Sequence, residues 1–284
     1  MSEDYDIVQV GTERNDLRPC GQLLADVFGR HSLFTTDYIK WQYADNPDGS
    51  IVGYNALSGR QLAAHYVTQP LQAMIGGSLK RGLLSLNTVT HPAHQGKGLF
   101  VNLAERTYKL AADMGYSFVI GVANQNSVHG FIKRLGFTQV GQLHALLGIG
   151  VLPFSSDMNK FAYSRHWTQE ALSWRLQNPS AKYGVSIGKQ IKVSSPTAYP
   201  GIKATVGVFD SAAYKLERKG SSPALMNLWI GANRDISNGA RAYFNIPLRW
   251  RPAPLYLIFK PLEQGLVVPK FDDVFFQALD FDAY

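Results

Sequence analysis

The residues with the clearest chemical potential lie between Thr88 and Phe100, where an apolar segment runs into a glycine turn and then into a helical pattern. Gly96 and Gly98 stand one residue apart at the predicted start of the helix, and Lys97 lies between them. The first amide N–H groups of a helix have no partner within it, so they can bind an anion, and the lysine adds positive charge. The turn therefore predicts a site for the pyrophosphate of a nucleotide cofactor.

The elements that must position this turn are predicted from apolar patterns. Residues 83–89 partly alternate, as a strand does, and this pattern ends before Pro92. The segment after the turn repeats apolar residues on one helical face and closes at Gly115. Residues 117–122 are almost wholly apolar, which is typical of a strand covered on both faces. A second helix is expected to follow, with a cap supplied by Asn124, Asn126 and Ser127, and to lead into another strand.

Two motifs in this region carry a family resemblance. Gln95, Gly98 and Phe100 occupy the places of a signature that reads Gln or Arg, two residues, Gly, one residue, then Gly or Ala. A helix that begins with Asn126 and ends in the dipeptide Gly-Phe follows it. With both motifs in this order, the segment resembles the GNAT superfamily of acetyl-CoA-dependent N-acetyltransferases. The resemblance covers roughly residues 5–150, about the size of one domain.

The resemblance implies a fold, a co-substrate and a reaction. The fold would be α/β with a mixed sheet of the GNAT type, and the co-substrate would be acetyl-CoA, with no metal. A neutral amine would attack the thioester directly, and a backbone N–H near Val89 would stabilise the oxyanion. Pantetheine would run along residues 88–90, with the pyrophosphate over residues 95–99. The residues assigned to cofactor binding on this basis are Thr88, Val89, Thr90, Gln95, Gly96, Lys97, Gly98, Leu99, Asn126 and Phe131.

The sequence departs from the family pattern at the catalytic base and acid. Many relatives carry a glutamate near residues 85–87 and a tyrosine near Phe131, and neither is present here. His91 leaves the strand beside the expected thioester, and because imidazole titrates near neutral pH, it is the predicted base. Tyr108 has a hydroxyl but is predicted to be a surface aromatic. A structural role remains the alternative for all three nearby histidines, His91, His94 and His129.

The second half of the chain repeats short motifs of the first. Trp41 and Trp174 each precede an Asn-Pro dipeptide by a few residues. Ile-Gly-Val-Ala-Asn at 120–124 is echoed by Ile-Gly-Ala-Asn at 230–233, and the order of the two motifs is kept. The repeat predicts two related halves, with both tryptophans as core anchors.

We therefore predict a catalytic GNAT domain over residues 1–150 and a degenerate GNAT-like domain over residues 151–284. The second half has no counterpart of the glycine turn, so it is not expected to bind the cofactor. It would pack against the first half and form a wall of the acceptor site. Seven basic residues between 211 and 251 are either a solvated surface or a wall for a phosphorylated acceptor, and Trp250 is a candidate for exposed recognition.

The composition indicates a soluble cytoplasmic enzyme. Hydrophobic residues make up 45% and charged residues 17% of the 284 residues, enough for a sizeable core. No apolar run approaches the length that spans a membrane, so no membrane partner is expected. Cys20 is the only cysteine, which excludes an intrachain disulfide and a cysteine metal site, and its apolar neighbours favour packing. The net charge of +7 permits nucleic-acid binding, but no nucleic-acid motif supports it.

The leading hypothesis is an N-acetyltransferase that acts on the amine of a small molecule, with an amino sugar or its nucleotide-linked form as the preferred acceptor. The first alternative is acetylation of a protein or peptide amine, which needs an open acceptor groove. The second is a non-catalytic acyl-CoA-binding pseudoenzyme, favoured by the missing glutamate and tyrosine. The sequence leaves a homodimer open.

Overall fold

One continuous mixed sheet of 15 strands runs through the molecule, and the computed structural model describes residues 4–281 apart from 155–157, 221–222 and 240. The first half contains, in chain order, β1 (Asp6–Gln9), α1 (Arg14–Phe28), α2 (Thr36–Tyr43), β2 (Val52–Ser58), β3 (Gln61–Ile75), β4 (Ser78–Thr90), η1 (Pro92–His94), α3 (Leu99–Asp113), β5 (Phe118–Ala123), α4 (Gln125–Leu135), β6 (Thr138–Gln142) and β7 (His144–Gly148).

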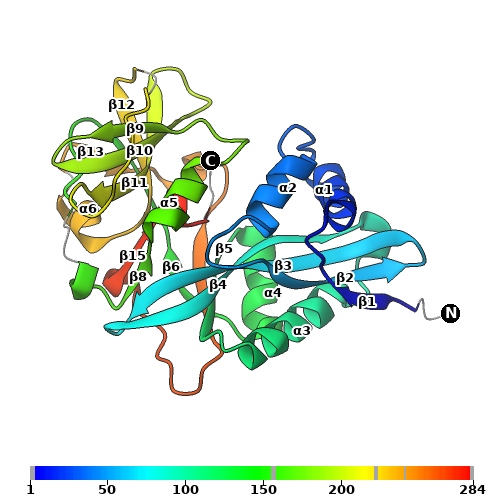
Figure 1. Cartoon of the computed structure of the whole chain (residues 1–284). Helices are drawn as coiled ribbons and strands as arrows, with labels where there is room; N and C mark the ends of the chain where they lie inside the picture. Colours follow the sequence, from blue (N-terminus) through cyan, green and yellow to red (C-terminus); the bar gives the residue numbers. More distant parts are fainter. Residues whose placement is uncertain (1–3, 155–157, 221–222, 240, 282–284) are drawn as a thin grey trace.

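The second half follows and lies beside the first (Figure 1). It contains η2 (Met158–Lys160), β8 (Tyr163–His166), α5 (Gln169–Leu176), β9 (Gly184–Ile187), β10 (Gln190–Pro196), β11 (Ile202–Asp210), β12 (Met226–Ala232), α6 (Arg234–Gly239), β13 (Tyr243–Asn245), η3 (Leu248–Trp250), β14 (Tyr256–Pro261), η4 (Phe271–Asp273), β15 (Val274–Gln277) and η5 (Ala278–Phe281). None of the helices in the described residues is both long and apolar enough to cross a membrane.

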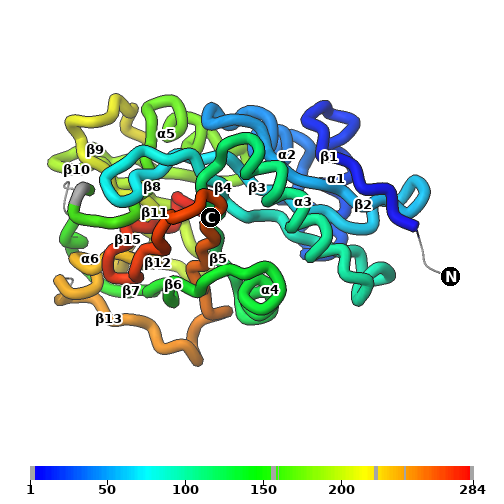
Figure 2. Tube along the Cα trace, turned by 90° about the horizontal axis from the view of Figure 1, so that it is seen from below, coloured from blue at the N-terminus to red at the C-terminus, as the bar shows by residue number. Residues whose placement is uncertain are grey.

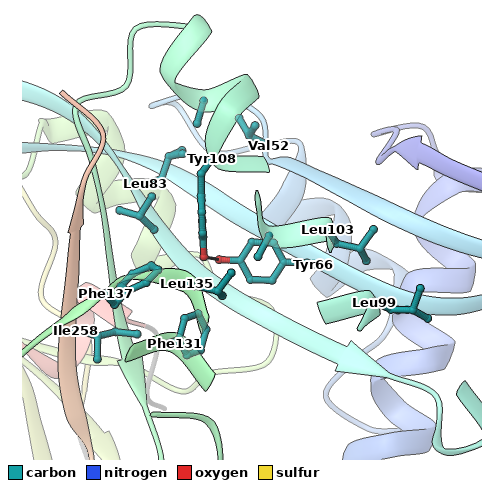
Figure 3. Packing of buried hydrophobic residues seen from close by; sticks show 14 of the residues in the cluster. Val52, Tyr66, Leu83, Leu99, Leu103, Tyr108, Phe131, Leu135, Phe137 and Ile258 are labelled. Carbon is teal, nitrogen blue, oxygen red and sulfur yellow. Dashed lines mark hydrogen bonds between the residues drawn. The ribbon is translucent and has the colours of Figure 1, made fainter. Parts of the chain in front are cut away.

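The first half buries both faces of its sheet. Helices α1 and α2 cover one face of strands β2–β4, and α3 and α4 lie on the other (Figure 1). The apolar face predicted for the helix after the turn packs on the sheet through Leu103, Ala104 and Ala111, which are fully buried. The prediction of a surface position for Tyr108 is wrong. Its side chain points to the sheet and is 5% exposed, and its hydroxyl lies against that of Tyr66 (Figure 3).

The two halves exchange a strand. β7, the last strand of the first half, pairs with β12 and β13 of the second half. In return, β14 of the second half lies between β5 and β6 of the first, antiparallel to both. Figure 2 shows this segment, in orange, beside β5. The domain boundary at residue 150 therefore stays a prediction, because each half of the sheet is completed by a strand from the other half.

The order of elements repeats between the halves, in line with the sequence repeat. When α3 and the short η1 and η3 are left out, the run α2–β2–β3–β4–β5–α4–β6–β7 has its counterpart in α5–β9–β10–β11–β12–α6–β13–β14. The two tryptophans meet where the halves join: the rings of Trp41 and Trp174 stack with centroids 4.8 Å apart. Each indole N–H donates to the backbone carbonyl of the other tryptophan at 3.0 Å. Both side chains are buried, so the prediction of core anchors is confirmed.

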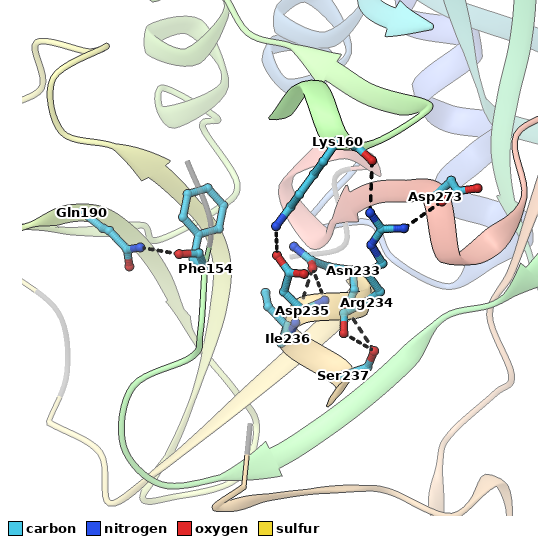
Figure 4. A network of polar contacts seen from close by, with 9 residues as sticks. All are labelled: Phe154, Lys160, Gln190, Asn233, Arg234, Asp235, Ile236, Ser237 and Asp273. Carbon is cyan, nitrogen blue, oxygen red and sulfur yellow. Dashed lines mark hydrogen bonds and ion pairs between the residues drawn. The ribbon is translucent and has the colours of Figure 1, made fainter. Parts of the chain in front are cut away.

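The second repeated motif supplies two helix caps. Asn124 Oδ1 accepts the amide protons of Asn126 and Ser127 at 2.9 and 3.0 Å, so a cap forms as predicted, and Asn124 is its N-cap residue. Asn233 Oδ1 accepts those of Asp235 and Ile236 at 2.9 and 3.3 Å at the start of α6 (Figure 4). An asparagine at this place satisfies amides that the first turn of a helix leaves open.

Candidate active site

The site is built where β4 and β5 separate. These parallel strands pair only from Gly82 to Ser85 on β4 and from Phe118 to Gly121 on β5. Beyond these pairs the ladder stops, and the following residues of β4 other than buried Val89 are partly exposed. We call this region the first divergence. A parallel pair that opens in this way leaves backbone groups on both strands available to a ligand.

A β-bulge on β4 lies within the first divergence. His65 of β3 pairs with Val89 and Val67 pairs with Leu86, so Tyr66 alone faces two residues of β4, Asn87 and Thr88. Asn87 has φ +48°, the one positive φ among the described residues other than glycine. A bulge takes a residue out of the ladder and turns its backbone groups to a new direction.

The ladder near the bulge also decides which amides face the opening. The His91 N–H donates to the Ala63 carbonyl at 2.8 Å across to β3. Because antiparallel pairs alternate, the amide of Val89 then faces β3, whereas that of Thr90 faces away from it, toward β5. The ladder thus favours Thr90 over Val89 as a donor to a ligand between the strands.

The glycine turn closes the open end of the first divergence. Gly96 and Gly98 have φ of +76° and +75°, and Gly98 is the N-cap of α3. A Cβ added at either glycine would meet no atom within 4 Å. Side chains there would instead project into open space beside the start of α3. The two glycines therefore supply both a left-handed backbone and an unobstructed approach to the first amides of α3.

A pocket of about 130 Å³ lies at this turn. It brings together six of the ten predicted cofactor residues: Thr90, Gln95, Gly96, Lys97, Gly98 and Leu99. Arg134, in the last turn of α4, also lines it and adds a second positive charge beside Lys97. Arg134 is not among the residues predicted from the sequence, although its place at the end of the second motif is a usable signal.

The other four predicted residues lie outside the lining of this pocket. Thr88 and Val89 lie on β4 at and beside the bulge. Asn126 is exposed in the first turn of α4. Phe131 is a core residue: it is 5% exposed, and its ring lies 5.3 Å from that of Phe100. Phe100 itself reaches into the core, which explains why the turn tolerates a large side chain at the third signature position.

The three histidines have different surroundings. His91 is partly exposed at the end of β4, and its Nδ1 accepts the Ala93 amide proton at 3.2 Å. This bond places the proton of the neutral ring on Nε2, so acting as a base requires Nδ1 to leave Ala93. His94 is buried and bonded to the Tyr5 hydroxyl at 2.9 Å. His129 is exposed on α4.

A chain of hydroxyls runs from the first divergence into the core. Tyr66 Oη lies 2.9 Å from Ser85 Oγ and 2.6 Å from Tyr108 Oη. Ser85 is the last residue of β4 that pairs with β5. Burial raises the pKa of Tyr66 to about 12, so its hydroxyl is a proton donor and not an anion at neutral pH. No local pattern links these three residues, which lie on β3, β4 and α3.

The basic residues predicted as a wall scatter over the second half. Arg234 pairs with Asp273 at 2.9 Å, and Arg251 donates to the Leu143 carbonyl at 2.8 Å. Trp250 is 64% exposed with the Arg249 guanidinium above its ring, as expected of a surface aromatic. A phosphorylated acceptor therefore stays a prediction.

The second half has a divergence of its own, which is filled. β11 and β12 are parallel and pair only from Ile202–Thr205 to Met226–Trp229. Beyond these pairs, β15 lies against β12 with Gly231 opposite Gln277. Gln277 Oε1 accepts the Val208 amide proton of β11 at 2.9 Å, so β15 bridges both strands. We call this region the second divergence.

Comparisons with known proteins agree with this architecture. The family model of an acetyltransferase (GNAT) domain matches residues 12–140. No curated protein sequence matches the chain significantly. Residues 12–140 therefore form a GNAT-type acetyltransferase domain.

Solved structures extend the likeness to the second half. A probable N-acyltransferase from Enterococcus faecalis has a TM-score of 0.62 and 12% identity, over 92% of this chain and 73% of its own. A GCN5-related N-acetyltransferase from Anabaena variabilis has a TM-score of 0.59 and 11% identity, over 91% of this chain and 73% of its own. The N-myristoyltransferase of Saccharomyces cerevisiae, solved with myristoyl-CoA, has a TM-score of 0.59 and 9% identity, over 91% of this chain and 83% of its own. At these identities the likeness shows a shared fold.

Proposed function

We propose that this protein transfers an acetyl group from acetyl-CoA to the amine of a small molecule. The observation that carries the proposal is the first divergence, in which an opened parallel pair, a bulge and a glycine turn follow one another along the chain. The turn would hold the pyrophosphate with its amides, Lys97 and Arg134. The pantetheine would follow residues 88–90, and the acyl group would reach the bulge.

The reaction we propose is a direct attack. The amine nitrogen forms a bond to the thioester carbon, the carbonyl oxygen gains negative charge, and the carbon–sulfur bond then breaks. The amides of the bulge at Asn87 and Thr88 would stabilise the oxyanion, because they are removed from the regular ladder. Fixed amides of this kind act mainly on the transition state.

Two proton transfers complete the balance. The proton of the attacking amine goes to a base, and the thiolate of CoA takes a proton as it leaves. His91 is our candidate base, once Nδ1 has released the Ala93 amide. Ser85 is our candidate acid, because its hydroxyl lies at the end of the chain through Tyr66 and Tyr108.

The test is thiol release from acetyl-CoA with a panel of amines. We expect CoA to form with at least one small amine, amino sugars and nucleotide-linked amino sugars included. Turnover with peptide N-termini or lysines alone would favour a protein acetyltransferase. If the protein binds CoA but releases no thiol with any amine, it is a binding module and the proposal fails.

A further inference from the structure

The side chain of Asn87 is held from two sides. Its Nδ2 donates to Gln42 Oε1 at 2.6 Å and to the Tyr43 hydroxyl at 3.0 Å. Both partners come from the end of α2, on the face of the sheet opposite α3. Asn87 has the left-handed backbone of the bulge, so these two bonds fix the residue on which the course of β4 depends.

A buried chain of hydrogen bonds continues from Tyr43. The Tyr43 hydroxyl lies 2.7 Å from His65 Nε2, and His65 Nδ1 lies 2.7 Å from Asn55 Oδ1. Asn55 Nδ2 in turn donates to Cys20 Sγ at 3.7 Å. Because Asn55 Oδ1 can only accept, His65 Nδ1 carries the proton, and Nε2 accepts from Tyr43 when the ring is neutral.

The ring of His65 stays neutral. It is 1% exposed, and burial lowers its pKa to about 3. The chain therefore has one direction at neutral pH: Asn87 donates to Tyr43, Tyr43 to His65, and His65 to Asn55. Each donor in the chain is satisfied by the acceptor that follows it. The hydroxyl of Tyr43 is therefore held in place as an acceptor for Asn87.

A second chain connects Asn87 to the other half of the molecule. Gln69 Nε2 donates to the backbone carbonyl of Gln42 at 2.9 Å. Gln69 Oε1 accepts from Arg175 Nη2 at 3.2 Å. Arg175 is a fully buried residue of α5, with its guanidinium 4.8 Å from the ring of Trp174. The second half thus reaches the bulge through Gln69 and Gln42.

We propose that Asn87 is a positioning residue that sets the oxyanion amides, and that Tyr43 and the chain from Arg175 hold it in place. This inference rests on the proposed function. It gives the second half a role in the reaction: it stabilises the geometry of the first divergence. It also predicts that the affected step is acyl transfer, while binding of CoA at the glycine turn is preserved.

The test compares three variants with a matched control. Asn87→Gly removes the side chain but keeps a residue that accepts positive φ, and Tyr43→Phe removes only the hydroxyl. Gln69→Met breaks the chain from Arg175. The control is Tyr54→Phe, because the hydroxyl that it removes is hydrogen-bonded only to exposed Gln9 in the described structure. For each protein we would measure kcat, the Kd of CoA by calorimetry, and hydrogen exchange of the amides of residues 87–90.

We expect kcat to fall roughly 100-fold in Asn87→Gly and roughly 10-fold in Tyr43→Phe, since misplaced oxyanion donors cost factors of this size. The Kd of CoA should stay within about threefold of the wild-type value. If the residues had a merely structural role, binding of CoA would weaken together with kcat. Exchange of the β4 amides should be faster in both variants and unchanged in Tyr54→Phe. Gln69→Met should move kcat and exchange in the same direction, by a smaller factor.

Several results would overturn the inference. An unchanged kcat in Asn87→Gly, or a loss of CoA affinity that matches the loss of kcat, contradicts a positioning role. Unchanged values in Gln69→Met contradict the role of the second half. If the wild type shows no acyl transfer, the proposed function fails, and the exchange data then decide alone whether Asn87 and Tyr43 set the β4 amides.

Discussion

The two divergences begin alike and end differently. In each half, four residues of one strand pair in parallel with four of the next, and the strands then separate. The first divergence leads through a bulge to a glycine turn and the 15-residue helix α3. The second is followed by a connection that, in its described residues, holds turns and one isolated bridge, between Lys219 and Val185. The opening of a parallel pair is thus common to both halves, and the element that follows it makes the first a candidate ligand site.

The contents of the two divergences complete the contrast. In the second, β15 pairs with β12 and bonds to β11 through Gln277, as a bound ligand with amide groups would. A segment of the chain itself therefore occupies the second divergence. A filled divergence adds to stability, and an open one keeps its backbone groups for binding.

The largest effect is expected from weakening the packing of β15, which fills the second divergence. Phe276→Ala removes a side chain that is 1% exposed, which should lower the free energy of unfolding by about 3–5 kcal/mol, measured by denaturant unfolding. CoA should not bind at the second divergence of this variant, because the glycine turn is missing there. Phe244→Ala, at a position 49% exposed, is the control. An equal loss in both would mean that β15 adds no specific stability.

The next effect concerns the open divergence. Gly98→Asp places a negative charge where the pyrophosphate is expected and should weaken CoA binding at least about 100-fold, measured by calorimetry. Gly59→Asp is the matched control, since Gly59 has φ +59° and a Cβ added there would also meet no atom within 4 Å. Aspartate tolerates this backbone better than most residues, which keeps strain comparable. Equal affinities for both variants would contradict the assignment of the turn.

A pH dependence is expected from Asp280, which anchors β15. Its carboxylate accepts the Gln277 amide proton at 2.7 Å and that of the Trp167 indole at 3.0 Å. Burial raises its pKa to about 6 from 3.8. The folded state therefore binds its proton more tightly, so this contribution to stability is present below about pH 4 and is lost as the pH rises through 6.

Asp280→Asn should remove this dependence. The free energy of unfolding of the variant minus that of the wild type should rise between pH 4 and pH 7 by up to about 3 kcal/mol. Denaturant unfolding at both pH values measures it, and the lost bond to Gln277 adds only a constant. A difference independent of pH would show that folding does not raise the pKa of this carboxyl.

The smallest effect is expected on CoA binding, in a comparison of two neighbouring basic residues of α4. Arg134→Ala should weaken CoA binding about 5- to 10-fold, because an exposed ion pair contributes about 1 kcal/mol. Lys133→Ala, at the next position but outside the pocket lining, should leave the Kd unchanged. The loss should shrink in high salt, as screening requires. The reverse ranking of the two variants would remove Arg134 from the site.

Much of the first half could be predicted because its signals are local. The helix after Gly98 and the cap at Asn124 depend on residues a few positions apart, and both formed as expected. Trp41 and Trp174 could be recognised as equivalent from their shared motif. Tyr108 was misjudged because its partner, Tyr66, lies 42 positions away on another element. Asn87 gave no signal, since its bulge depends on pairing with β3 and on side chains of α2.

The sequence by itself determined the glycine turn, the helix that it starts and the family to which this part of the chain belongs. These features follow from backbone preferences and apolar periods, which act over short stretches. Only the tertiary structure decided that β14 completes the first half, that β15 fills the second divergence and that the two halves meet at Trp41 and Trp174. Those contacts join residues more than 100 positions apart in several cases, such as Trp41 and Trp174, 133 positions apart. Burial and hydrogen bonding across such separations select them, and no local pattern encodes the choice.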